Sequence, residues 1–253
     1  MRLRMLSSAV TVAAVTITTV ATHIPPAGAS ASGVALASMG TGSSSLLSRF
    51  DYGSASPLGT KSKVCYSQGM DQGGIGILSQ DFEDAFDTYD AEAADDFTPT
   101  KKCTITEIHL EGEYFNGSGP ADAWRVRFYK SDKAGLPGKV FSDQTVEAAM
   151  IHQSLDPDTG KSLIVLIIIG VVAFFCFKHP ESCSVSIQAK MDFSKGGEWG
   201  WATTNQAYGK PAVWRNPGDG FGTGCTNWGV MQNCVGDVGE GPDFAFSLIG
   251  GTK

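Results

Sequence analysis

Eight acidic residues and no basic ones occupy positions 81–96. Clustered carboxylates supply the hard oxygen donors that Ca²⁺ prefers, and the candidate ligands of a structural calcium ion are Asp81, Asp84, Asp95 and Asp96. Two carboxylates held at a fixed separation could instead serve as the acid–base pair of a glycosidase-like hydrolase. A third interpretation is a solvated acidic helix face with the aromatic residues of the same stretch behind it. Spacing alone leaves all three open.

The tryptophans offer a second kind of chemistry. Trp199 and Trp201 are separated by one residue, so they would share a face if they lie on a strand. Trp214, Asn216 and Trp228 follow in a glycine-rich C-terminal stretch. Exposed indole rings beside polar amides could stack on sugar rings, so these five residues are the candidate ligand-binding set. The alternative is that the rings fill the core, as most large aromatic side chains do.

The N-terminus has the features of an export signal. Arg2 and Arg4 precede an apolar stretch from Met5 to Ala21, and Ala27-Gly28-Ala29 supplies small residues for cleavage. We therefore expect residues 1–29 to be a signal peptide and the mature chain to be secreted or extracellular. An uncleaved membrane anchor is the alternative interpretation.

Six cysteines in an exported chain indicate disulfides. Short spacing favours the pairs Cys225–Cys234 and Cys176–Cys183, which leaves Cys65 and Cys103. A zinc site is disfavoured because no CxxC motif occurs and the histidines are scattered. Asn116 opens an Asn-Gly-Ser sequon, which makes it a candidate glycosylation site in a eukaryotic host.

Alternating apolar and polar residues define the elements that must position these groups. The alternation is clearest over residues 108–114, 124–129, 185–193 and 244–248, and it is typical of half-buried antiparallel strands. The sequence therefore predicts an all-β protein, an antiparallel and jelly-roll-like β-sandwich with long Gly-rich loops over residues 64–253. Residues 30–63 are rich in Ser, Gly and Ala and are expected to form a flexible leader.

One apolar run, residues 163–177, interrupts this pattern. A helix of this length would span about 22 Å, which is short of a hydrocarbon core of about 30 Å. Its Ile and Val content favours a buried strand, or a hairpin that turns at Gly170. A membrane-inserted segment and an error in the gene model are the other readings of this run.

Composition limits the partners. The chain has a formal net charge of −7, which argues against a nucleic-acid partner because phosphates need a basic surface. No cofactor other than a structural calcium ion is expected, and a membrane partner is disfavoured. The leading hypothesis is a module that binds a carbohydrate or a cell-envelope polymer through the C-terminal Trp, Gly and Asn loops. The alternatives are the hydrolase named above and a surface or matrix protein without catalysis; oligomeric state is open.

Several short motifs resemble those of a class of secreted, bacterial-type β-sandwich domains. They are ADDF (94–97), GLPG (135–138), WGW (199–201), GFGTGC (220–225) and PDFAF (242–246). The resemblance covers roughly residues 79–249 and implies a jelly-roll-like, extracellular domain with no agreed activity. The chain departs from the class at residues 164–183, where such domains have a shorter connection.

Overall fold

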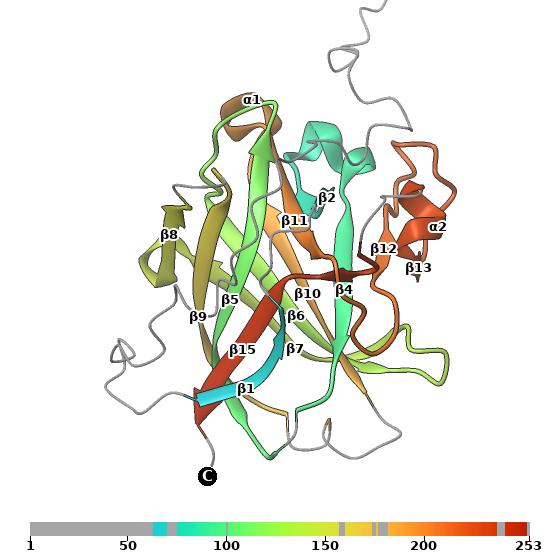
Figure 1. Cartoon of the computed structure of the whole chain (residues 1–253). Helices are drawn as coiled ribbons and strands as arrows, with labels where there is room; N and C mark the ends of the chain where they lie inside the picture. The colour runs from blue at the N-terminus through green and yellow to red at the C-terminus, as the bar shows by residue number, and fades with distance from the viewer. Residues whose placement is uncertain are drawn as a thin grey trace, which may run out of the picture.

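The computed structural model describes residues 63–69, 75–99, 101–156, 160–173, 176, 182–236 and 241–251. The signal peptide expected at 1–29 and almost all of the leader expected at 30–63 lie outside these ranges. In the described part, two antiparallel sheets pack face to face, as predicted (Figure 1). Consecutive strands repeatedly pass from one sheet to the other, as they do in a jelly roll.

The eight-stranded sheet lies in front in Figure 1 and is centred on one long strand, β5. Its strands are β1 (Lys63–Gln68), β15 (Phe246–Gly251), β5 (Thr104–Phe115), β11 (Glu198–Thr204), β14 (Asp243–Phe244), β2 (Gly76–Leu78), β9 (Ser162–Val172) and β8 (Ile151–Leu155).

The seven-stranded sheet lies behind it, and its middle strands are β4, β10 and β6. In order across the sheet its strands are β13 (Gly229–Val230), β12 (Val213–Arg215), β4 (Glu92–Phe97), β10 (Cys183–Lys190), β6 (Ala123–Ser131) and β7 (Pro137–Glu147). The short strand β3 (Gln80–Asp81) runs parallel to β10.

Helices are few and short. They are the 3₁₀ turns η2 (Asp84–Tyr89) and η3 (Ala148–Met150) and the α-helical turns α1 (Phe193–Gly196) and α2 (Met231–Val235). None of the helices in the described ranges has the length and apolarity needed to cross a bilayer. Residues 81–96 therefore do not form one acidic helix, because η2 ends at Tyr89 and β4 begins three residues later.

The core lies between the sheets and is built from the apolar side chains that occupy every second position of the predicted strands. Trp124 on β6 meets Trp199 on β11 edge to face, with ring centroids 4.5 Å apart. Gly112 on β5 leaves the space for this pair, because a Cβ atom there would lie 2.4 Å from the Trp199 ring. The alternation in residues 124–129 and 185–189 thus correctly separated the core-facing residues from the outward ones.

Residues 163–172 of the apolar run belong to one strand, β9, which is paired with β5 on one side and β8 on the other. Ile164, Leu166 and Ile168 are buried in the core, which confirms the buried-strand interpretation. The hairpin alternative is wrong, because Gly170 lies within β9. Neighbouring Ile169 is 80% exposed, and its backbone N–H and C=O bond the side-chain amide of Gln144 on β7.

Three disulfides are present, including the two predicted pairs Cys176–Cys183 and Cys225–Cys234. The third, Cys65–Cys103, joins β1 to the residue before β5. Three disulfides are compatible with an oxidising extracellular environment.

Candidate functional site

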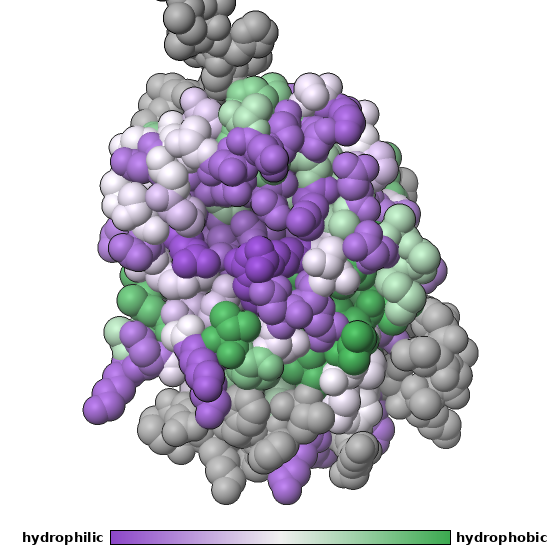
Figure 2. Space-filling view, turned by 180° about the vertical axis from the view of Figure 1, so that it is seen from behind, coloured by the Kyte–Doolittle hydropathy of each residue, from purple (hydrophilic) through white to green (hydrophobic). Residues whose placement is uncertain are grey.

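The outward face of the seven-stranded sheet is polar, yet its middle is sheltered from solvent. Ser184, Ser186 and Gln188 occupy the outward parity of β10 and are only 1–6% exposed. Figure 2 shows hydrophilic side chains gathered over the middle of this side of the molecule, where the surface is hollowed. We call this the polar face: the outward side chains of β12, β4, β10, β6 and β7.

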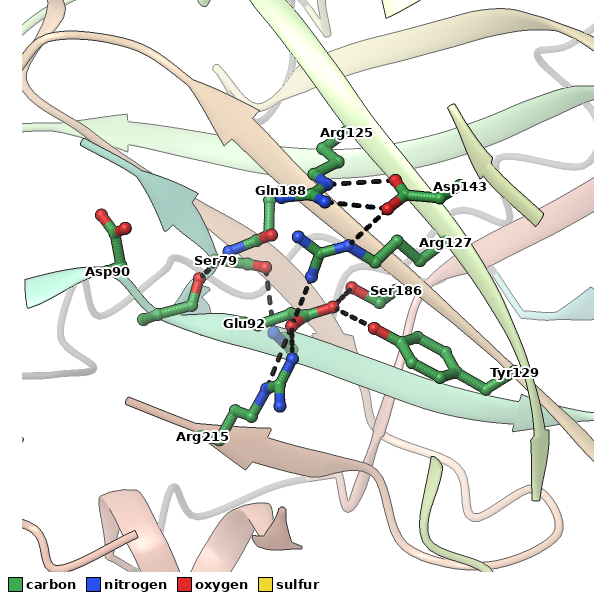
Figure 3. Close-up of polar contacts among 12 residues, drawn as sticks. Ser79, Asp90, Glu92, Arg125, Arg127, Tyr129, Asp143, Ser186, Gln188 and Arg215 are labelled. Atoms are coloured by element: carbon green, nitrogen blue, oxygen red, sulfur yellow. Dashed lines mark hydrogen bonds and ion pairs between the residues drawn. The ribbon is translucent and has the colours of Figure 1, made fainter. Parts of the chain in front are cut away.

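Glu92 on β4 is at the centre of the polar face (Figure 3). Its Oε2 accepts from Arg127 Nη1 on β6 at 2.7 Å and from Arg215 Nε on β12 at 3.0 Å. Its Oε1 accepts from the Tyr129 hydroxyl at 2.7 Å and from the Ser186 hydroxyl at 2.5 Å. One carboxylate therefore joins four strands: β12, β4, β10 and β6.

This arrangement keeps Glu92 ionised despite its burial. Burial raises the pKa of a carboxyl group, but the guanidinium groups of Arg127 and Arg215 and the two hydroxyl donors outweigh burial and lower the pKa of Glu92. Because it is held ionised, Glu92 does not suit the part of a general acid. The sheltered charge is instead compensated, as buried ions must be.

A second carboxylate extends the network to β7. Asp143 accepts two hydrogen bonds from Arg125, at 3.0 Å from Nε and 2.8 Å from Nη2, and lies 3.5 Å from Arg127 Nε. Hydrogen bonding from Arg125 lowers the pKa of Asp143. Unlike Glu92, Asp143 is well exposed, with 40% of its side chain accessible. The polar face therefore contains three guanidinium groups and two carboxylates in one connected network.

Trp228 stands at one end of the polar face, on the loop that leads to β13. Its ring packs edge-on to Tyr129, with centroids 5.9 Å apart, and the Arg215 guanidinium lies 4.4 Å from the indole centroid. The Cys225–Cys234 disulfide closes the loop that carries it. Trp228 remains partly exposed, so the structure places one predicted ligand-binding aromatic at the polar face.

Asn216 holds the start of the loop that carries Trp228 through buried hydrogen bonds. It is fully buried, and its amide donates to the carbonyls of Thr88 and Asp90, while its oxygen accepts from the Phe221 N–H. Its own N–H bonds the carbonyl of Cys225. Asn216 is therefore a scaffold residue rather than the ligand contact that was predicted.

The other three tryptophans of the predicted ligand-binding set, Trp199, Trp201 and Trp214, are fully buried, which corrects the prediction of an exposed aromatic platform. Trp214 points into the core and donates to the Leu78 carbonyl at 2.8 Å. Trp201 stacks on Phe244, with ring centroids 4.5 Å apart. With Trp199 they fill the space between the sheets, because large rings bury the most apolar area there.

The structure does not gather the four predicted calcium ligands. Asp81 pairs with Lys190 at 3.3 Å, and Asp84 is exposed on η2. Asp95 and Asp96 are neighbours on β4 and so point to opposite sides of the sheet. Within the described ranges, no three His, Cys, Asp or Glu side chains converge as a metal site requires. The geometry therefore lends no support to the calcium hypothesis.

Asp95 points inward and meets Asp243 from β14. It accepts from Gln68 Nε2 and from the Phe244 N–H, both at 2.7 Å. Burial raises the pKa of Asp95 well above its ordinary value, and it raises the pKa of Asp243 to about 6. Asp95 therefore ties β1 and β14 to β4, while Asp243 accepts from the backbone N–H groups of Tyr208 and Ala212.

The hydrolase hypothesis needs two carboxyl groups that flank a bond. Within the acidic run, Asp90 has a raised pKa of about 6, which results mainly from burial. However, its side chain is hydrogen-bonded to that of Asp81. Glycosidase carboxyl groups stand about 5 Å or more apart. This pair is too close for a glycosidic bond to lie between its members.

Asn116 lies in an exposed turn after β5, with a positive φ of 58°. Its side-chain amide donates to Glu198 at the start of β11. The sequon is thus accessible, as the glycosylation hypothesis requires, while the modification itself stays a prediction.

Sequence reasoning missed Glu92, Arg125, Arg127, Arg215 and Asp143 as members of one site. The available signal was the set of polar residues at the outward positions of two predicted strands. These residues are arginines in the strand at 124–129 and small polar residues in the strand at 185–189. Comparison of the chain with family models, curated proteins and solved structures found no match.

Proposed function

We propose that the protein is an exported carbohydrate-binding module, and that the polar face with Trp228 at its end is the binding surface. This retains the polymer-binding hypothesis but moves the site. The contacts come from the outward face of a sheet and one disulfide-closed loop, rather than from a set of four tryptophans.

The observation that supports the proposal is the preorganised polar network around Glu92. The partly exposed side chains of Arg125, Arg215 and Asp143 present fixed donors and acceptors, which suit the hydroxyl groups of a sugar. The partly exposed indole of Trp228 offers apolar area against which a sugar ring can pack. Because Arg127, Arg215 and Tyr129 are already held by Glu92, binding would order few side chains, and little conformational entropy would be lost.

The proposal can be tested by screening the mature protein against a glycan panel and measuring affinity for the best ligand by calorimetry. Trp228→Ala is expected to weaken binding about tenfold through loss of ring contact, and Trp228→Phe is expected to restore part of it. Leu155→Ala is a matched control, because Leu155 is an exposed apolar residue on the other sheet. Equal affinities for Trp228→Ala and Leu155→Ala would show that the ligand binds elsewhere.

A further inference from the structure

The network around Glu92 and Asp143 has a charge of opposite sign to that of the whole chain. Arg125, Arg127 and Arg215 face Glu92 and Asp143, so the connected network carries 3 − 2 = +1, in a chain of net charge −7. Both carboxylates are committed to guanidinium groups. The uncompensated charge of this network is therefore that of a guanidinium group.

Arg215 presents this charge in a fixed orientation. Its guanidinium is held between the Glu92 carboxylate, which takes Nε and Nη2, and the indole face of Trp228. Nη1 has no hydrogen bond to the described part of the chain, and 27% of the side chain is exposed. A rigidly held guanidinium whose Nη1 is free to donate, next to an aromatic ring, is suited to binding a carboxylate group of a ligand.

Arg125 repeats the arrangement on the other side of the polar face. Asp143 takes its Nε and Nη2, Nη1 again has no partner among the described residues, and 36% of the side chain is exposed. Arg215 lies on β12 and Arg125 on β6, with β4 and β10 between them. Three strand spacings of about 4.8 Å place the two backbones about 14 Å apart, with Gln188 between them.

From these two open guanidinium edges we propose that the ligand is an acidic polysaccharide, one whose sugars carry carboxylate groups at intervals along the chain. Arg215 and Arg125 bind carboxylates that lie on separate sugars, while the partly exposed ring of Trp228 packs against a sugar ring. This inference rests on the proposed function and specifies the class of glycan that the face selects.

The probe is polygalacturonate, compared with its fully methyl-esterified form, which keeps the sugars and removes the charges. The mature protein is expected to bind the acid form at least tenfold more tightly than the ester, because hydrogen bonds between charged groups are lost with the ester. Arg215→Gln and Arg125→Gln are each expected to lower affinity for the acid form about tenfold. Lys63→Gln removes one positive charge from an exposed position on the other sheet and should change affinity less than twofold.

Each result either supports or overturns the assignment. Equal binding of acid and ester, or an equal loss in Lys63→Gln and Arg215→Gln, would overturn it. Binding of neutral glycans alone, sensitive to Trp228→Ala, would overturn it while leaving the proposed function intact. Failure to bind any glycan would overturn both. Because Arg215 also supports Glu92, a urea midpoint is measured for each variant, and Arg125→Gln, whose partner Asp143 is exposed, provides the second test.

Discussion

Glu92→Gln is the most informative single substitution, because one carboxylate holds together four strands of the polar face. It keeps the shape of the side chain and removes its charge. The side chain of Glu92 is 3% exposed and that of Arg127 is 11% exposed, so the substitution removes the nearer counter-ion of a sheltered guanidinium and leaves it only the 3.5 Å contact with exposed Asp143. Breaking a buried ion pair from one side costs about 3–5 kcal/mol. Arg215 is more exposed and regains water, which favours the lower end of that range.

The assay is urea denaturation of the oxidised protein, followed by tryptophan fluorescence. With a slope of about 2 kcal/mol per molar urea, a loss of about 3 kcal/mol lowers the midpoint by about 1.5 M. Asp143→Asn is the matched control: it removes a carboxylate from the same network at a position that is 40% exposed. An exposed pair contributes less than about 1 kcal/mol, so its midpoint should fall by less than about 0.5 M.

The pH dependence of the same variant provides an independent check. The pKa of Glu92 is lowered in the folded protein, so its stabilising contribution is present above its ordinary pKa of 4.5 and is lost on acidification below it. The difference between wild type and Glu92→Gln should therefore shrink as the pH falls below about 4.5. Equal midpoints for Glu92→Gln and Asp143→Asn, or a difference independent of pH, would refute the role given to Glu92.

Three further predictions concern the core, the buried acids and the loop. Ile168→Lys places a charge in the core and should lower the free energy of unfolding by roughly 4 kcal/mol or more in the same urea assay. Ile169 is 80% exposed, so Ile169→Lys should change that free energy by less than about 0.5 kcal/mol. Because burial raises the pKa of Asp243 to about 6, wild type should lose stability relative to Asp243→Asn as the pH rises from 4 to 7; a difference in denaturation midpoints that does not change with pH would contradict this. Replacing both Cys225 and Cys234 by Ser should lower the free energy of unfolding by roughly 2–3 kcal/mol. The same variant should also bind glycan more weakly in calorimetry carried out at a temperature where it is fully folded, because the loop that carries Trp228 is no longer closed.

Periodic and local features were predictable from the sequence. The strands at 124–129 and 185–189 were recognised because side chains alternate with a period of two. For the apolar run, a buried strand or hairpin was favoured because the run is rich in Ile and Val and short for a membrane helix. Cys176–Cys183 and Cys225–Cys234 were paired correctly because the partners are only seven and nine residues apart. Each of these inferences depends on neighbours along the chain.

Only the tertiary structure decided which polar and aromatic residues belong to a site. Glu92 and Arg215 are 123 residues apart, and their contact depends on β12 pairing with β4. Trp214 and Trp228 look alike in the sequence, but Trp214 faces the core from β12 and Trp228 is carried on a disulfide-closed loop. Alternation shows which residues share a side of a strand, but it does not show what covers that side. What covers a strand depends on the order of strands in the sheet. That order is fixed by pairings between segments far apart in the chain, which no local sequence pattern reveals.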